Sequence, residues 1–281
     1  MSMSYARDDW YAVAMTAQLR DGHQRKTRLL GEEIVVSGSA DAPRVTDGSG
    51  KSLPVQLRYD HLWTTLSDTP RALFEISEAA ETDRRFVPCG MVTVRCSPLR
   101  AVENFLDIAH FPYVHTGILG EEPHTEVKPY KVEIREDVDE VWATQIGFHQ
   151  PQAAKSATEA IETRYEYRVP APTTAILYKT CPPKPESWDV IAIFVQPVEE
   201  GRCDVWPWMA LYDDVSAYAD LVQFQQEIFL QDRSILENQK PTLLPLDPQM
   251  EIPTRSDLTS VVYRRWLKRK GATYGAHTSA A

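Results

Sequence analysis

An aspartate and two histidines, all common metal ligands, lie close together in residues 103–117. Asp107 and His110 are three positions apart, which places them about 60° apart around one face of a helix. His115 follows His110 by five positions and would lie roughly 140° away from it on a regular helix. Pro112 stands between the two histidines and lacks an N–H group, so we expect the helix to depart from regular geometry there. That departure would let both imidazoles face one metal ion.

The third ligand is expected from a helix far downstream. Residues 224–239 have a helical pattern in which Asp232 shares one face with Gln225 and Phe229. A carboxylate on such a face is costly unless it binds a partner. Two histidines and one carboxylate on one side of a metal, with the other positions open, are the ligands of non-haem Fe(II) oxygenases. We predict a mononuclear iron site with three ligands, His110, His115 and Asp232.

A longer motif contains these residues. The spacing Asn-x2-Asp-x2-His-x4-His is found at Asn104, Asp107, His110 and His115. Together with the later Asp232, it resembles the catalytic domain of Rieske-type non-haem iron oxygenases. The resemblance implies that Asp107 carries electrons from a Rieske centre to the iron ligand His110, and that Asn104 lies just outside the ligands. Residues 10–14 and 29–36 are similar to the opening strands of the vanillate-demethylase-like branch of that family.

The ligands of a Rieske cluster are missing from this sequence. A Rieske [2Fe–2S] centre needs two cysteine and two histidine ligands, which the family supplies as Cys-x-His and Cys-x-x-His. The four cysteines here stand singly, and none has a histidine at these spacings. Residues 37–52, where the cluster loops belong, are rich in Gly, Ser and Asp and predict one or two turns. We therefore expect a truncated Rieske-like module, with the [2Fe–2S] centre supplied in trans by a Rieske-containing reductase.

This combination resembles the methylxanthine N-demethylases of bacterial caffeine degradation, which are monooxygenases. The resemblance implies conversion of 7-methylxanthine to xanthine and formaldehyde, with Fe(II), O2, and NADH acting through the reductase. It also implies a homotrimer or a hetero-oligomer with homologous N-demethylase subunits. A flat purinedione needs apolar walls and a few amide-type partners. We predict Gln225 as the polar contact and Phe229 and Phe111 as walls.

Two other functions stay open on the sequence alone. O-demethylation or hydroxylation of another aromatic substrate, such as a methoxy-aromatic acid, would call for a cation beside the carboxylate. Arg164 and Lys179, in expected strands, are the candidates. A non-catalytic, ligand-binding companion subunit is the alternative outside the enzymes. The retained metal-ligand set argues against it, because a binding protein has no use for such a set.

Composition restricts the partners. The chain has 281 residues, 43% apolar and 25% charged, enough for one large domain or two modest ones. Its net charge of −10 argues against nucleic acid. No apolar run reaches the roughly 20 residues of a membrane span, and the first ten residues carry charges where a signal peptide would be apolar. We expect a cytoplasmic protein with no nucleic-acid or membrane partner.

The pattern predicts an α+β fold. The resemblance implies a helix-grip catalytic domain at residues 76–267, with an antiparallel sheet and a long C-terminal helix. The β-rich Rieske remnant is expected at 1–75, and a polar tail that frays at 268–281. Ser216 is predicted to cap the long helix, which should end near residue 239. Further strands are expected at 55–63, 90–96, 125–136, 141–148, 160–169, 174–178, 189–195 and 202–211.

Overall fold

One antiparallel sheet of eight strands forms the centre of the molecule, and the computed structural model describes residues 4–277 around it. Hydrogen-bonded neighbours follow the order β7-β14-β13-β12-β11-β10-β9, and β8 also pairs with β14. The strands are β7 Arg85–Pro88, β8 Val92–Val94, β9 Lys131–Arg135, β10 Glu140–Gln150, β11 Ile161–Ala171, β12 Thr174–Thr180, β13 Trp188–Glu199 and β14 Arg202–Leu211. The antiparallel sheet predicted from the sequence is confirmed.

Both faces of the central strands β12, β13 and β14 are buried. Successive side chains of a strand point to opposite faces. On β13, Ile193 and Val195 belong to the core beneath the helices, whereas Phe194 belongs to a second core on the other face. Trp206 and Trp208 on β14 also lie in that second core. Burial on two faces explains why these strands are continuously apolar in the sequence.

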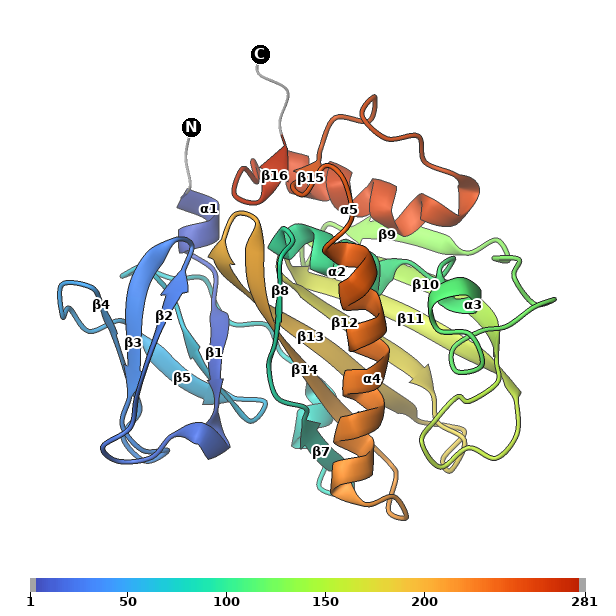
Figure 1. Cartoon of the computed structure of the whole chain (residues 1–281), viewed down its shortest axis with the longest axis horizontal. Helices are drawn as coiled ribbons and strands as arrows, with labels where there is room; N and C mark the ends of the chain where they lie inside the picture. The colour runs from blue at the N-terminus through green and yellow to red at the C-terminus, as the bar shows by residue number, and fades with distance from the viewer. Residues whose placement is uncertain (1–3, 278–281) are drawn as a thin grey trace.

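Three helices cover one face of the sheet (Figure 1). They are α2 Pro98–Leu106, α4 Tyr218–Leu236 and α5 Leu258–Arg269. The long α4 runs across the strands in Figure 1. Its buried positions are Leu221, Gln225, Phe229, Asp232 and Leu236. They recur every three or four residues, so the helix face predicted to carry Asp232 is the buried face.

A smaller N-terminal module packs on the other face of the sheet. It contains two three-stranded sheets, β1-β6-β5 and β2-β3-β4. Its elements are α1 Ser4–Arg7, β1 Tyr11–Met15, η1 Thr16–Gln18, β2 Gln24–Leu29, β3 Glu32–Ser37, β4 Arg44–Asp47, β5 Val55–Arg58 and β6 His61–Thr64. The rings of Trp63 and Phe194 lie 4.8 Å apart, and the Leu30 N–H donates to the Pro197 carbonyl at 2.7 Å. Aromatic packing and backbone bonds therefore join the module to β13.

Two predictions about this module are wrong. The single strand expected at 55–63 is a hairpin, because Tyr59 and Asp60 have φ angles of 52° and 57° and reverse the chain between β5 and β6. No glycine marks this turn in the sequence. Residues 37–52, expected to form only turns, contain β4, whose Val45 pairs with Val36 of β3.

The long helix begins one residue later than predicted. Ala217 occupies the cap position of α4 without a side-chain bond. The Ser216 hydroxyl and N–H instead donate to the Asp213 carboxylate at 2.8 Å each. The helix ends at Leu236, close to the predicted end.

The C-terminal region is more ordered than the sequence indicated. The helix α5 was not predicted, and η3 Arg255–Asp257 precedes it. The tail expected to fray from residue 268 is instead structured through residue 277, because α5 extends to Arg269 and β16 Ala276–His277 pairs with β15 Leu244–Pro245. Residues 278–281 of that tail lie outside the described residues. Over residues 4–277, no helix combines the length and the apolar character that crossing a membrane requires.

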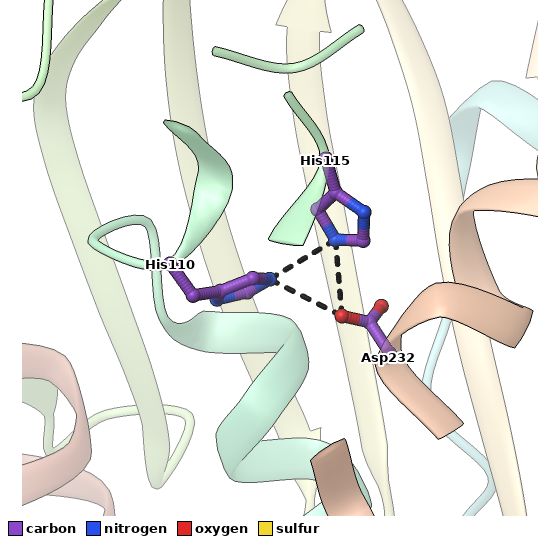
Figure 2. Close-up of side chains that lie close together, drawn as sticks. All are labelled: His110, His115 and Asp232. Carbon is purple, nitrogen blue, oxygen red and sulfur yellow. Dashed lines mark hydrogen bonds and ion pairs between the residues drawn. The ribbon is translucent and has the colours of Figure 1, made fainter. Parts of the chain in front are cut away.

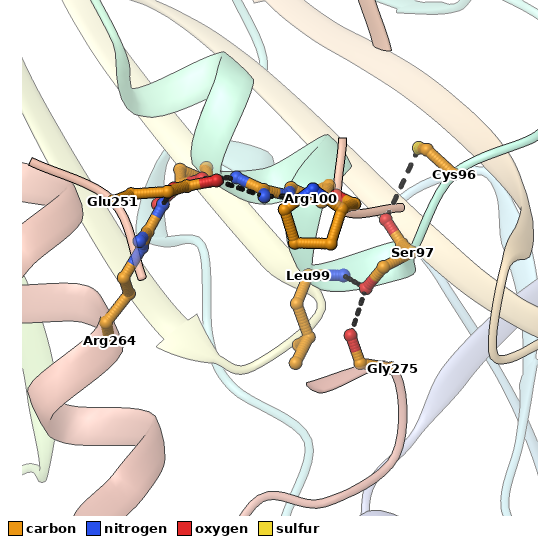
Figure 3. A network of polar contacts seen from close by, with 9 residues as sticks. Cys96, Ser97, Leu99, Arg100, Glu251, Arg264 and Gly275 are labelled. Carbon is orange, nitrogen blue, oxygen red and sulfur yellow. Dashed lines mark hydrogen bonds and ion pairs between the residues drawn. The ribbon is translucent and has the colours of Figure 1, made fainter. Parts of the chain in front are cut away.

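A buried network of charged side chains fixes α2 to the C-terminal region (Figure 3). Arg100 is 1% exposed and donates to Glu103 at 3.0 Å and to Glu251 at 2.5 Å. Arg264 of α5 donates to the same two carboxylates at 2.5 and 2.6 Å. Each guanidinium thus bridges both acids, which offsets the loss of water around four charges. The network holds the helix that leads directly into residues 107–115.

Candidate metal centre

The helical path of the chain is interrupted just before the two histidines. Helix α2 ends at Leu106, Asp107 is extended, and the short helix α3 Phe111–Val114 follows. His110 and His115 stand at the two ends of α3. The departure from regular geometry predicted between the histidines at Pro112 is wrong in its place, because the chain breaks before His110, between α2 and α3, and is helical from Phe111 to Val114. Pro112 lies in the first turn of α3, where a missing N–H costs no helical bond.

The two histidines and Asp232 converge on one point (Figure 2). The two Nε2 atoms of His110 and His115 are 3.1 Å apart, and Asp232 Oδ1 lies 3.2 and 3.0 Å from them. Ligand atoms about 2.1 Å from a metal and at right angles to one another lie about 3.0 Å apart. The three atoms therefore have the spacing of one face of an octahedral coordination shell. Within residues 4–277, this is the one group of three or more such side chains whose donor atoms come this close.

The Asp232 carboxylate fits a bound cation. Its side chain is 9% exposed, and its buried Oδ1 atom faces the Nε2 atoms of His110 and His115, without a hydrogen bond of regular geometry among the described residues. Burying a carboxylate oxygen in this way is costly unless a cation faces it. The donor set of two imidazoles and one carboxylate suits Fe(II). The residues that are present therefore fit the metal predicted from the sequence.

The charges of the cluster also favour a cation. Burial lowers the pKa of His110, but the Asp107 and Asp232 carboxylates outweigh it and raise that pKa to about 9. Burial raises the pKa of Asp232, but the two adjacent imidazoles outweigh it and lower that pKa to about 2. At neutral pH, without metal, the proton on His110 offsets only one of the two carboxylate charges, so the cluster stays net negative. A divalent ion would displace that proton.

Each imidazole is oriented by a partner on its other nitrogen. His110 Nδ1 lies 3.1 Å from Asp107 Oδ2, and His115 Nδ1 lies 2.7 Å from Gln231 Oε1. Such contacts hold Nδ1–H in place and leave Nε2 free to bind a metal. Asp107 was predicted as the neighbour of His110. Gln231 was not predicted, although its position directly before Asp232 was a usable signal.

His110, His115 and Asp232 all line one pocket, which lies between α4 and the sheet. Gln225, Phe229, Phe111 and Asn104, all singled out from the sequence, line the same pocket. The Phe111 ring lies 5.1 Å from the His110 ring and contacts Tyr165 at 6.2 Å. The sequence analysis did not identify the pocket residues of the sheet, which include Tyr165, Tyr167, Leu177, Asp189, Ile191 and Met209. Lys179 lines the pocket, whereas Arg164 is exposed and lies 5.7 Å from the Trp188 ring.

An antiparallel sheet, a long helix across it, and a two-histidine, one-carboxylate set inside the resulting pocket define the class of mononuclear non-haem iron oxygenases. The model of the vanillate O-demethylase oxygenase C-terminal domain matches residues 94–273. The chain belongs to this family, the catalytic domains of Rieske-type oxygenases, and it carries no Rieske-ligand motif of its own. It is therefore an oxidoreductase of the oxygenase type.

Named relatives agree with this assignment. The chain is 45% identical over 280 residues to the probable methylxanthine N7-demethylase NdmC of Pseudomonas sp. (strain TJI-51), and the match covers 97% of each chain. Its fold is similar to that of NdmA of Pseudomonas putida CBB5 with caffeine, with a TM-score of 0.78 at 18% identity over 95% of this chain and 92% of that one. Dicamba monooxygenase bound to 3,6-dichlorosalicylic acid follows with a TM-score of 0.69 at 14% identity, covering 96% and 99%.

Proposed function

We propose that this protein removes the N7-methyl group of 7-methylxanthine and yields xanthine and formaldehyde. The observation that carries the proposal is the triangle of His110 Nε2, His115 Nε2 and Asp232 Oδ1, with sides of 3.0 to 3.2 Å, in the wall of a largely apolar pocket. The name of the 45% identical relative supports a methylxanthine as the substrate.

His110, His115 and Asp232 would hold the metal. Bound Fe(II) would supply the activation of O2 that hydroxylation of an N-methyl group requires. Phe111 and Phe229 would flank the flat substrate ring, and the Gln225 amide would bond one of its polar edge atoms. Asn104 would lie beside His110 at the metal end of the pocket. The N-hydroxymethyl product then breaks its C–N bond, releasing formaldehyde and leaving a proton on the ring nitrogen.

The two electrons would come from another protein. This sequence has no Cys-x-His or Cys-x-x-His pair, so we propose a partner reductase whose [2Fe–2S] Rieske centre is reduced by NADH. Asp107 would be the electron-transfer bridge, since its carboxylate contacts His110 Nδ1 at 3.1 Å and its side chain is 30% exposed. Reduction of one O2 would then form one water and place one oxygen atom on the methyl group. A homotrimer or a hetero-oligomer with related N-demethylase subunits would place the partners side by side.

We further assign a helix-grip architecture to residues 76–267 and regard residues 1–75 as a Rieske-like module without cluster ligands, with 268–281 as the tail. Support comes from α4 lying across the main sheet and from the small β1–β6 sheets on its opposite face. All four cysteines are free and buried, which agrees with a cytoplasmic location.

The test is a turnover assay with matched omissions. Protein loaded with Fe(II) is mixed with 7-methylxanthine, NADH, O2 and a Rieske-containing reductase, and xanthine and formaldehyde are measured. We expect xanthine and formaldehyde in equal amounts. Neither product should form with His115→Ala or with a reductase that lacks its Rieske domain. Turnover with a Rieske-free reductase would contradict the electron route. Bound iron without formaldehyde would contradict the substrate.

A second candidate is O-demethylation of a methoxy-aromatic acid, and Lys179 in the pocket is the observation that favours it. Arg164, the other cation considered for this role, is exposed and does not line the pocket. Running the same assay with 4-methoxybenzoate separates the candidates, because only the second predicts formaldehyde from that compound.

A further inference from the structure

Lys179 is a cation in the interior of the substrate pocket. It lies on β12, is 5% exposed and lines the pocket. Its neighbours across the sheet are Tyr165 on β11 and Asp189 on β13, and both line the same pocket. A lysine is seldom buried in this way without a partner for its charge. The surroundings of Lys179 therefore bear on what the pocket binds.

The ammonium group of Lys179 is only partly paired. It donates to the Ala153 carbonyl, and its Nζ lies 5.8 Å from the centre of the Tyr165 ring. Among residues 4–277 it forms no direct ion pair; the charge of its cross-strand neighbour Asp189 acts on it from a longer distance, and the Asp189 carboxylate accepts the Tyr212 N–H at 3.1 Å. An ammonium has three donors, so the Ala153 bond leaves two. Burial lowers the pKa of Lys179 to about 8, which still leaves most molecules cationic at pH 7.

The position of Lys179 relative to the metal ligands follows from a row of rings. The centre of the Phe111 ring lies 5.1 Å from that of His110 and 6.2 Å from that of Tyr165. Tyr165 is the direct cross-strand neighbour of Lys179. A flat molecule with its reacting methyl group at the histidines and its ring along Phe111 and Tyr165 would reach Lys179 with its far edge.

We propose that Lys179 is a substrate-recognition residue, whose ammonium donates a hydrogen bond to the exocyclic oxygen at the edge of the substrate farthest from the reacting methyl group. This inference rests on the proposed function and makes it more specific. In 7-methylxanthine the oxygen farthest from the N7-methyl group is the one on C2. A charge-assisted bond to it recovers the interaction that Lys179 loses by leaving water.

The contact between Lys179 and the C2 oxygen is tested by removing the oxygen from the ligand and the ammonium group from the protein. The dissociation constants of 7-methylxanthine and of 7-methylhypoxanthine, which lacks the C2 oxygen, are measured by calorimetry on Co(II)-loaded protein, which does not turn over. We compare wild type, Lys179→Met and the control Lys128→Met, which removes a 66% exposed lysine paired with Glu162. Lys179→Met should weaken 7-methylxanthine binding by roughly 10- to 100-fold and 7-methylhypoxanthine binding by less than about threefold. Lys128→Met should change neither.

The possible failures are distinguishable. An equal loss of affinity for both ligands in Lys179→Met would overturn the inference and show that Lys179 instead holds the segment around Ala153 in place. Equal affinity of the wild-type protein for the two ligands would also overturn it, and this comparison does not depend on whether a variant folds. A wild-type protein that binds neither purine would overturn the proposed substrate itself. That failure appears before any substitution is made.

Discussion

Two side chains outside the ligand triangle decide where its imidazoles point. Gln231 accepts from His115 at 2.7 Å, and Asp107 contacts His110 at 3.1 Å. Both act on Nδ1 and leave Nε2 for the metal. Since neither side chain touches the metal position itself, their effect on metal binding is separable from that of the ligands.

Replacing Gln231 should weaken metal binding without unfolding the protein. Gln231→Leu removes the acceptor that holds the His115 ring and its tautomer, so Co(II) or Fe(II) affinity should fall by roughly 10- to 100-fold. Gln231→Glu keeps an acceptor and should retain most of the affinity. Metal titration followed by d–d absorption of Co(II) gives the readout, with Gln223→Leu, at an exposed position of the same helix, as control. Equal metal affinity of Gln231→Leu and wild type would show that Gln231 does not support metal binding.

Metal uptake should be linked to proton release from His110. The pKa of His110 is raised to about 9, so this residue is protonated at pH 7 without metal. A metal ion requires the neutral imidazole, so about one proton should leave per ion at pH 7 and almost none above pH ~10. Apparent affinity should accordingly rise with pH up to about 9 and then level off. Calorimetry in buffers of different ionisation enthalpy counts the protons, and no release at pH 7 would contradict the expectation.

At the scale of elements, the site depends on how closely α3 is packed. The segment after α3 returns so near to it that a Cβ on Gly120 would lie 2.8 Å from the Pro112 nitrogen and 3.1 Å from the Phe111 carbonyl carbon. Both are backbone atoms, which cannot rotate away. Because His110 and His115 flank α3, a shift of this helix moves their imidazoles relative to Asp232, which belongs to α4.

Gly120→Ala should therefore damage the metal site from outside it. We expect a destabilisation of about 1–3 kcal/mol from overpacking, together with a loss of metal affinity of roughly tenfold or more. Gly147→Ala is the matched control, because its nearest neighbouring atom would lie 3.8 Å away. Metal titration and chemical denaturation are measured for both variants. An unchanged affinity in Gly120→Ala would mean that α3 moves without consequence for the histidines.

At the scale of the whole molecule, His61 stands at the junction between the N-terminal module and the main sheet. It is 0% exposed, its ring meets Phe194 and Trp206 edge-on, and its Nε2 has no hydrogen-bond partner among the described residues. Burial lowers the pKa of His61 to about 4. The folded protein therefore keeps this imidazole neutral where the unfolded chain would protonate it.

The free energy of unfolding should consequently decrease as the pH is lowered from about 6.5 to 4. In that window the unfolded chain binds a proton at His61 that the folded protein does not, so this group lowers the free energy of unfolding by up to about 1.4 kcal/mol per pH unit. His61→Phe should make this dependence shallower. Urea unfolding at pH 7, 6 and 5 is compared for wild type, His61→Phe and the exposed control His23→Phe. Comparing slopes cancels other groups, such as Asp9, whose pKa burial raises to about 7. Identical slopes for wild type and His61→Phe would contradict the role of this residue.

The local sequence determined much of this protein. The apolar strand runs predicted the hairpins of the main sheet, and the three-to-four spacing of Gln225, Phe229 and Asp232 predicted one buried helix face. The family resemblance followed from short motifs. These features depend on backbone preferences and periodicity, which neighbouring residues fix.

Only the tertiary structure decided which distant residues contact one another. Asp232 reaches the histidines because α4 crosses the sheet, which no pattern within residues 224–239 encodes. The same packing placed Gln231 against His115, left Arg164 exposed and put Lys179 inside the pocket. The helix α5, absent from the sequence analysis, is anchored by Arg264 in a network with residues far away in the chain. Side-chain partners separated by a hundred residues are chosen by long-range packing, so local propensity predicts the elements but not their contacts.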